Sequence, residues 1–341
     1  MKIKHLVLLL TAVIPAYLLL APKAKPVPSD LRDAVSDGAF DSLPGVSTGV
    51  NSPEVSAPAY QEETSDRKSI YGDDDRTDYY SADPVKRSLA DSVVSFWESG
   101  SVTMAGGKAL LGVMNFGRAA RLCPGEKFAE QPIGAFCSGT LVGEDIVMTA
   151  GHCIVDQAKC ADTKLVFGYS LKKAGDYPSS VPPEDVYSCS SIIKRDLDVT
   201  PGFLASIWNG GPGPDFALIK LDRKVAGRKP LAVNRRSKPA NGDQLFVIGH
   251  PVGLPVKIAG NAKVRKASPR YFFLTDLDTF GGNSGSAVFN AKTNLIEGIL
   301  VRGDVDFVNS PAGCKVASVV PQEGGHGEAV TKISVLEKFI P

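Results

Sequence analysis

The segment DTFGGNSGSAVF, residues 278–289, places a serine between small residues and directly before an apolar run that is typical of a buried strand. Glycines on both sides of Ser284 allow the backbone to turn sharply and a ligand to approach closely. We expect the N–H groups of Gly282 and Ser284 to point to one spot beside the Ser284 hydroxyl, as an oxyanion hole requires. A serine hydroxyl alone is a weak nucleophile, so the segment predicts a base and an orienting group elsewhere in the chain.

Two further segments contain candidates for that base and that orienting group. TAGHC at 149–153 contains His152, and DFALIKL at 215–221 begins with Asp215, directly after a turn rich in glycine and proline. The chain order His, Asp, Ser is that of the chymotrypsin-type triad and differs from the orders in subtilisin and the α/β-hydrolases. We therefore predict that His152 is the general base, that Asp215 orients it, and that Ser284 is the nucleophile.

The other three histidines are not expected to act as the base. His5 lies in an apolar leader, and His326 lies in a glycine-rich loop where we expect it to be solvated. His250 lies in the loop GHPVGLP at 249–255, where a structural role is expected.

Four motifs together carry a resemblance to a known family. CSGTLV at 137–142, TAGHC, DFALIKL and GGNSGS at 281–286 follow one another as in the trypsin-like (chymotrypsin-fold) serine endopeptidases. GGNSGS, and YGDDDRT at 71–77, resemble the bacterial branch that contains the glutamyl endopeptidases. The resemblance extends over residues 70–341.

The resemblance implies an all-β fold of two antiparallel β-barrels of the chymotrypsin type, followed by a C-terminal helix. The barrels are expected at about 69–225 and 226–325. His152 and Asp215 would come from the first barrel and Ser284 from the second, with the active site between them. The apolar stripe of Ile333, Leu336 and Phe339 is consistent with the terminal helix.

Six cysteines fit an exported protein with disulfides. The family places a disulfide between Cys137 and Cys153, beside the histidine. The other four allow three pairings, which stay open: Cys123, Cys160, Cys189 and Cys314. A zinc site is the alternative, but no C-x-x-C or H-x-x-x-H spacing supports it, so no metal and no organic cofactor is expected.

Three positions depart from relatives of this kind. Asn283 stands where trypsin has the aspartate that pairs with the new N-terminus after activation, and an amide makes no such ion pair. Leu300 stands where the glutamyl endopeptidases have a histidine that reads the acidic substrate side chain. Val301 offers no polar group to support Asp215.

The expected substrate-binding residues are Asp278, Thr279 and Arg302. Asp278 lies six residues before the nucleophile, where an aspartate in the trypsins pairs with substrate Arg or Lys. Either Asp278 faces an open pocket and selects basic side chains, which we favour, or Arg302 neutralises it in an internal ion pair.

The first residues predict export. Lys2 and Lys4 precede an apolar run, so residues 1–24 are interpreted as a signal peptide, with an uncleaved anchor as the alternative. Residues 25–68 are interpreted as a pro-segment or disordered linker and 69–341 as the protease domain, which makes the chain a zymogen. Cleavage after Lys68 and an ordinary solvated charge cluster at 66–68 are equally supported. The mature protein is expected to be secreted or periplasmic, with no stable membrane span.

Charge excludes one class of partner. With 38 basic and 37 acidic residues, the chain lacks the electrostatic footprint of a nucleic-acid-binding protein. Three consecutive aspartates at 73–75 are interpreted as a solvated turn rather than a cation site. Residues 99–136 form an insert without a functional assignment.

The leading hypothesis is a secreted, monomeric serine endopeptidase that acts on protein or peptide substrates through an acyl-enzyme, with cleavage after Arg or Lys. The alternative is a catalytically idle homologue that acts as a binding or adhesive protein. A lipase or esterase is less well supported, because Ser286 replaces the final glycine of G-x-S-x-G and the chain order differs.

Overall fold

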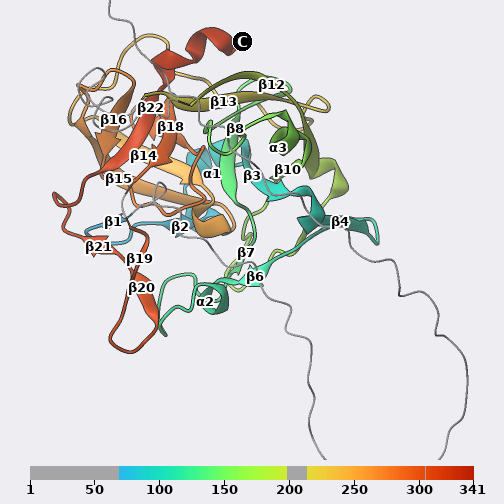
Figure 1. The fold of residues 1–341 in the computed structure, drawn as a ribbon, viewed down its shortest axis with the longest axis horizontal. Coiled ribbons are helices and arrows are strands. Elements are labelled where there is room, and N and C mark those ends of the chain that lie inside the picture. The colour runs from blue at the N-terminus through green and yellow to red at the C-terminus, as the bar shows by residue number, and fades with distance from the viewer. Residues whose placement is uncertain (1–68, 198–212, 304) are drawn as a thin grey trace, which may run out of the picture. The chain divides into compact units, whose positions relative to one another are not determined.

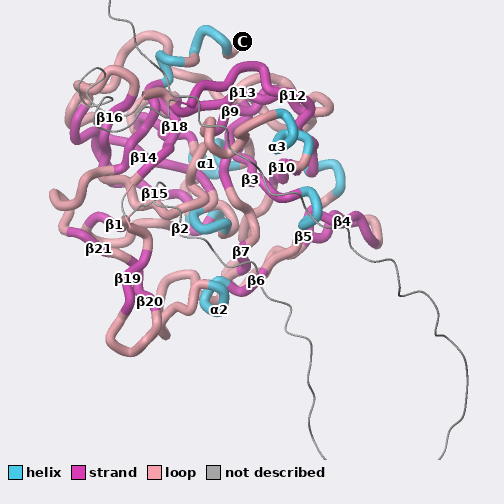
Figure 2. The backbone as a smooth tube through the Cα atoms, in the orientation of Figure 1, coloured by secondary structure: helices cyan, strands magenta, loops and turns pink. Residues whose placement is uncertain are grey.

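The computed structural model describes residues 69–197, 213–303 and 305–341 (Figure 1). The predicted signal peptide and pro-segment, 1–68, lie outside the described residues. Strands dominate the described chain and helices are short (Figure 2). None of these helices is long and apolar enough to cross a membrane.

The first barrel is a closed, antiparallel ring of six strands. Its strands, in order around the ring, are β3 (Val93–Glu98), β8 (Cys137–Leu141), β9 (Ile146–Thr149), β13 (Asp215–Leu221), β12 (Val186–Leu197) and β10 (Thr163–Phe167), which pairs with β3. The largely apolar sequence of β13 suits a strand of this ring, since six of its seven residues are buried. Closure leaves no free edge in the ring.

The second barrel also closes on itself. Its strands are β14 (Gln244–Gly249), β17 (Ala287–Asn290), β18 (Ile296–Arg302), β22 (Glu328–Lys332), β16 (Phe272–Thr275) and β15 (Lys257–Lys266), which pairs with β14. Apolar side chains such as Val288, Leu300 and Val330 fill its interior. The predicted all-β, two-barrel fold is therefore confirmed.

The barrel boundaries differ in two places from those expected. The second barrel runs to the end of β22, beyond residue 325, because β22 pairs with both β16 and β18. The N-terminal strand β2 (Thr77–Asp78) pairs with β15, so it extends the second barrel rather than the first. The segment after Ser69 is thus part of the wall around the nucleophile's barrel.

The expected C-terminal helix is present as two short 3-10 turns. These are η5 (Ile333–Val335) and η6 (Glu337–Phe339). Ile333, Leu336 and Ile340 are buried in the core that the two barrels share. The predicted apolar stripe therefore anchors the chain end.

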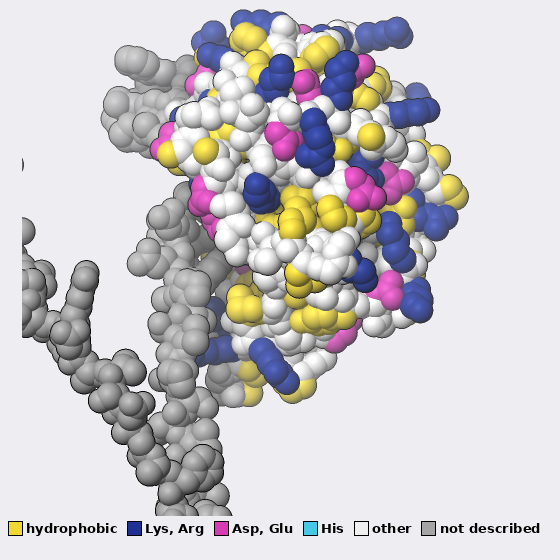
Figure 3. Space-filling model, turned by 90° about the vertical axis from the view of Figure 1, so that its right-hand side faces the viewer, with side chains coloured by type: hydrophobic (Ala, Val, Ile, Leu, Met, Phe, Trp, Pro, Cys, Tyr) yellow, Lys and Arg dark blue, Asp and Glu magenta, His cyan; other side chains and the backbone are white. Residues whose placement is uncertain are grey.

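Smaller elements surround the barrels. The insert at 99–136 contains η2 (Ser99–Ser101), β4 (Val102–Ala105), β5 (Lys108–Leu111), β6 (Met114–Asn115), α2 (Phe116–Ala119) and β7 (Pro132–Ile133). The others are β1 (Ile70–Tyr71), η1 (Tyr79–Ser81), α1 (Pro84–Ala90), α3 (Gln157–Ala161), β11 (Ser180–Val181), η3 (Pro183–Asp185), η4 (Pro251–Gly253), β19 (Phe307–Asn309), β20 (Lys315–Ala317) and β21 (Val319–Val320). Figure 3 shows one face of the molecule, on which basic side chains lie scattered with acidic and apolar ones between them.

Candidate active site

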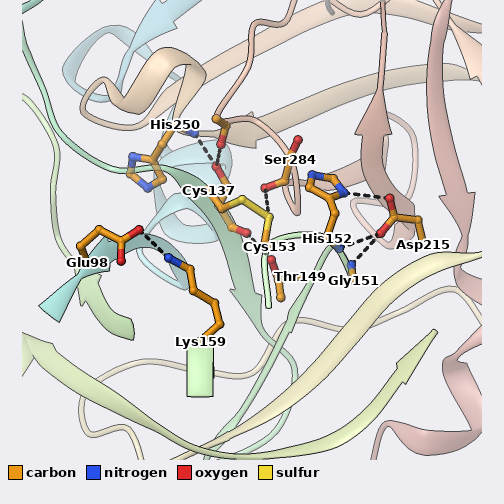
Figure 4. Close-up of a disulfide and its surroundings, with 12 residues drawn as sticks. Glu98, Cys137, Thr149, Gly151, His152, Cys153, Lys159, Asp215, His250 and Ser284 are labelled. Atoms are coloured by element: carbon orange, nitrogen blue, oxygen red, sulfur yellow. Dashed lines mark hydrogen bonds and ion pairs between the residues drawn. A yellow bond between two sulfur atoms is a disulfide. The ribbon is translucent and has the colours of Figure 1, made fainter. Parts of the chain in front are cut away.

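Asp215 and His152, which both belong to the first barrel, lie in contact. Asp215 is the first residue of β13, and its Oδ2 lies 2.8 Å from Nδ1 of His152 (Figure 4). Its Oδ1 accepts from the N–H groups of Gly151 at 2.7 Å and His152 at 3.2 Å. Three contacts from the loop that carries His152 therefore fix the carboxylate, and Asp215 is 1% exposed.

Burial alone would raise the pKa of the Asp215 carboxyl, but the hydrogen bond and charge of the His152 ring and the charge of Arg302 hold this pKa below its ordinary value. Asp215 is therefore an anion at neutral pH. An anion beside Nδ1 assigns the ring proton to that nitrogen, so the lone pair of the neutral ring lies at Nε2.

Ser284 reaches this pair from the second barrel. Its carbonyl accepts from the N–H of Ser138 in β8 at 2.9 Å and lies 3.6 Å from Sγ of Cys153, the neighbour of His152. Gly285 has φ +90°, and a Cβ there would come within 2.1 Å of the Ser138 carbonyl and 2.3 Å of Thr149 Oγ1. Only glycine fits this close approach, which seats the serine loop on the strands that carry His152. Figure 4 draws the His152 ring between Asp215 and Ser284.

The backbone before Ser284 is also held in one orientation. The Gly281 carbonyl accepts from the N–H of Val252 at 2.5 Å, and Gly282 has φ +80°. C=O and N–H of a trans peptide point in opposite directions, so the N–H of Gly282 points away from Val252. A hydrogen bond of 2.8 Å from the N–H of Ser286 to the Asn283 carbonyl then closes a turn around Ser284. The peptides Gly281–Gly282 and Asn283–Ser284 are thus both held by hydrogen bonds to their carbonyls. Their N–H groups, of Gly282 and Ser284, are those predicted to form the oxyanion hole.

The side chain of Asn283 faces Ser286, whose Oγ donates to its Oδ1 at 3.2 Å. The N–H of Ser69 instead donates to Oε1 of Glu328 at 3.3 Å, in a site where both residues are completely buried. Glu328 also accepts from Oγ1 of Thr279 at 2.7 Å. Thr279, an expected substrate-binding residue, therefore lies beside a carboxylate that the sequence analysis missed.

Asp278 is placed differently from either expectation. Its Oδ1 accepts from the N–H of Tyr71 at 2.7 Å and its Oδ2 from the N–H of Asp75 at 3.0 Å. Burial raises the pKa of the Asp278 carboxyl to about 7, although these two N–H groups oppose the shift. Asp278 lines a cavity of about 220 Å³ together with Asp73, Asp75 and Asp276. The carboxyl therefore fastens the N-terminal segment to the second barrel.

The alternative expectation, an ion pair between Asp278 and Arg302, is wrong, because Arg302 pairs with Asp215 instead. Nη2 of Arg302 lies 3.3 Å from Oδ2 of Asp215, the oxygen that binds His152. Oγ1 of Thr331 donates to the Asp215 main-chain carbonyl at 3.0 Å. The polar support that Val301 lacks thus comes from its neighbour Arg302 and from β22.

The disulfide expected beside the histidine is present, with Cys137 bonded to Cys153. Since their sulfurs are bonded to each other, these cysteines and His152 do not form the thiolate set of a zinc site. The pairings left open are Cys160–Cys189 and Cys123–Cys314. The second of these ties the insert to the loop between β19 and β20.

His250 has the structural position expected for it. It is 1% exposed, and its Nδ1 lies 2.9 Å from the Leu254 carbonyl. Burial lowers the pKa of its ring to about 3, so the ring is neutral at physiological pH. The main-chain N–H of His250 donates to Oγ of Ser138 at 2.9 Å. That hydroxyl in turn donates to the Gly282 carbonyl at 2.8 Å. His250 therefore helps to hold the serine loop.

Comparison with known proteins agrees with this geometry. A family model described as trypsin-like peptidase domain matches residues 137–299, slightly less than half of the chain. A glutamyl endopeptidase of Staphylococcus aureus (strain MRSA252) is 28% identical over 180 residues, which are 49% of this chain and 43% of the relative. A secreted RxLR effector protein 73 of Plasmopara viticola is 26% identical over 176 residues, 47% of this chain and 40% of the relative.

The match thus spans less than half the length of these curated relatives. A solved structure of Glu endopeptidase in complex with MPD is also similar, with 17% identity and a TM-score of 0.44, over 80% of this chain and 97% of that one. Residues 137–299 therefore match the trypsin-like peptidase domain model within a two-barrel fold, and the chain resembles the glutamyl endopeptidases among the trypsin-like serine endopeptidases.

Proposed function

We propose that the chain is a serine endopeptidase that hydrolyses peptide bonds through His152, Asp215 and Ser284. The observation that carries the proposal is the 2.8 Å contact between Asp215 and Nδ1 of His152, with the Ser284 loop seated on the strands that bear the histidine. An anion at Nδ1 makes Nε2 the basic nitrogen, which is what a serine hydroxyl needs for activation.

In the first half of the reaction, Oγ of Ser284 attacks the substrate carbonyl carbon while Nε2 of His152 takes the hydroxyl proton. The tetrahedral oxyanion is stabilised by the N–H groups of Gly282 and Ser284. The C–N bond then breaks, His152 gives its proton to the leaving amine, and an acyl-enzyme remains. Water repeats these steps on the acyl-enzyme and releases the acid. Asp215 stabilises the imidazolium in both halves without taking the proton.

The substrate side chain is a separate part of the proposal. Our first candidate is Arg or Lys before the scissile bond, which rests on the place of Asp278 six residues before Ser284. The second candidate is Glu, which the name of the Staphylococcus aureus relatives favours. Leu300 weighs against the second, because it is completely buried in the second barrel's interior and offers no polar atom to a substrate carboxylate.

Export is likewise a proposal. Three disulfides among the described cysteines are typical of proteins that fold in oxidising compartments, which supports a secreted or periplasmic location.

The decisive experiment compares the parent with Ser284→Ala on matched peptides that carry Arg, Glu or Leu before the cut. Turnover should fall by a factor on the order of 10⁶ in Ser284→Ala if the three residues act as a unit. Ser81→Ala, at an exposed serine, is the matched control and should retain full activity. Equal activity in parent and Ser284→Ala would refute the proposal. A folded parent that cleaves none of the peptides would instead support the idle homologue.

A further inference from the structure

Arg302 occupies an unusual place on β18. Alternating side chains on a strand face opposite sides, and Leu300 faces the second barrel's interior while Val301 joins the core shared with the first barrel. Strict alternation would return residue 302 to the apolar interior, where a guanidinium is costly. The pairing of β18 with β22 is interrupted by a β-bulge between Leu300 and Arg302. Such a bulge re-aims the side chains that follow it.

The bulge directs Arg302 across the barrel interface to Asp215. Its Nη2 lies 3.3 Å from Oδ2 of Asp215, and the Arg302 side chain is 25% exposed. The same strand holds the nucleophile loop, since the Leu300 carbonyl accepts from the N–H of Gly285 at 2.8 Å and the Leu300 N–H donates to the Ser286 carbonyl at 2.9 Å. One strand of the second barrel therefore grips both the loop of Ser284 and the carboxylate of Asp215.

We propose that Arg302 is a positioning residue for the hydrolysis, which holds Asp215 in register with Ser284. Because its guanidinium is positive and shares the Asp215 carboxylate with the His152 ring, it also disfavours a positive charge on that ring. The inference rests on the proposed function. Its consequence is that the enzyme keeps its general base unprotonated at lower pH than it would without the guanidinium.

Among the residues that the structure describes, the other groups around Asp215 have different roles. On β12, Arg195 donates from Nε to the Gly151 carbonyl at 2.8 Å, so it supports the histidine loop rather than the carboxylate. Its neighbour Asp196 is exposed. On β22, the contact to Asp215 comes from the uncharged Thr331 and reaches only the main-chain carbonyl.

The test measures kcat and KM across pH for the parent, Arg302→Met, Arg302→Lys and the control Lys292→Met, which removes an exposed charge from the turn after β17. We expect Arg302→Met to lower kcat roughly tenfold with little change in KM, as for other groups that orient a catalytic residue. The midpoint of the acidic limb of kcat/KM should move up by roughly half to one pH unit, because the partly exposed charge is screened. Arg302→Lys should restore the midpoint and part of kcat.

An acidic limb that does not move in Arg302→Met, relative to Lys292→Met, overturns the inference whatever happens to kcat. A rise in KM with unchanged kcat and an unmoved limb would make Arg302 a substrate contact instead. If Arg302→Met fails to fold, judged by its circular dichroism, Arg302→Gln takes its place with the same expected shift. A parent without peptidase activity would refute the proposed function, whereas an active parent with an unmoved limb refutes only the role of Arg302.

Discussion

The N–H of Ser138, on a strand of the first barrel, donates to the carbonyl of Ser284, in a loop of the second barrel, across 2.9 Å. This bond joins the predicted nucleophile to the strand that lies beside the histidine. A site assembled in this way depends on the packing of the two barrels, so changes at their interface should affect activity before they affect the rest of the fold.

The first prediction concerns the disulfide beside His152. Replacing Cys137 and Cys153 together by alanine reopens a loop with a sequence separation of 16 residues. The free energy of unfolding should fall by about 3 kcal/mol on a chain-entropy model. Removing Cys123 and Cys314, whose separation is 191 residues, should cost more, about 5 kcal/mol on the same model.

Urea unfolding of both double variants measures these free energies, and peptide hydrolysis measures the site. We expect activity to fall in the Cys137/Cys153 variant at temperatures where it is still folded, because the bond fixes the histidine loop. Full activity in that variant would contradict the role assigned to this disulfide.

The second prediction concerns pH and Asp278. The pKa of this carboxyl is raised from 3.8 to about 7, chiefly by burial. The folded state therefore holds a proton that the unfolded state releases between about pH 4 and 7. Its contribution to stability is complete below the unfolded pKa and is lost as pH rises through 7. The charged groups that face it, Asp74 and Asp75, act in the same direction.

Asp278→Asn removes this titration while it keeps one acceptor for the N–H groups of Tyr71 and Asp75. The parent should lose on the order of 2–4 kcal/mol of unfolding free energy between pH 4 and 8 through this carboxyl. The variant should be less stable than the parent at pH 4, by about 1–3 kcal/mol for the unpaired N–H, and should lose less on going to pH 8. Identical pH slopes in the two proteins would show that Asp278 is ionised in the folded state well below pH 7.

The sequence predicts the reactive residues of the candidate site but not the partners of its buried carboxylates. His152, Asp215 and Ser284 were identifiable because each lies in a short segment whose residue types suit one chemical role. The partners of Asp278 were not, because Tyr71 lies 207 residues away in the chain and no local pattern encodes such a contact. Glu328 escaped notice for the same reason, at a separation of 49 residues from Thr279.

Arg302 shows a different limit. The sequence identifies Arg302 as a candidate substrate-binding residue, but the direction of its side chain depends on a bulge in β18 that the alternation of side chains does not reveal. The two barrels, in contrast, follow from many short apolar runs that each pair with a neighbour. Local patterns therefore predict strands and reactive residues, whereas the orientation of one charged side chain depends on the register of pairing.

The third prediction concerns maturation. We expect the active protein to begin near Ser69, after cleavage that follows Lys68, which lies outside the described residues. The main-chain nitrogen of Ser69 lies 3.3 Å from Oε1 of Glu328, so a new α-ammonium there would form a charge-assisted hydrogen bond with that carboxylate. Intact-mass analysis and N-terminal sequencing of the active protein test the position of the cut. An active species that still carries residues 26–66 would contradict the need for removal.

The most direct measurement of the proposed chemistry is labelling with a fluorophosphonate, which reacts with an activated serine, followed by mass spectrometry of the digested protein. The parent should carry one adduct, on the peptide that contains Ser284, and neither Ser284→Ala nor heat-denatured parent should carry it. His152→Ala should label far more slowly, because the base that activates the hydroxyl is gone. An adduct on another residue, or a folded parent that remains unlabelled, would contradict the assignment of Ser284 as the nucleophile.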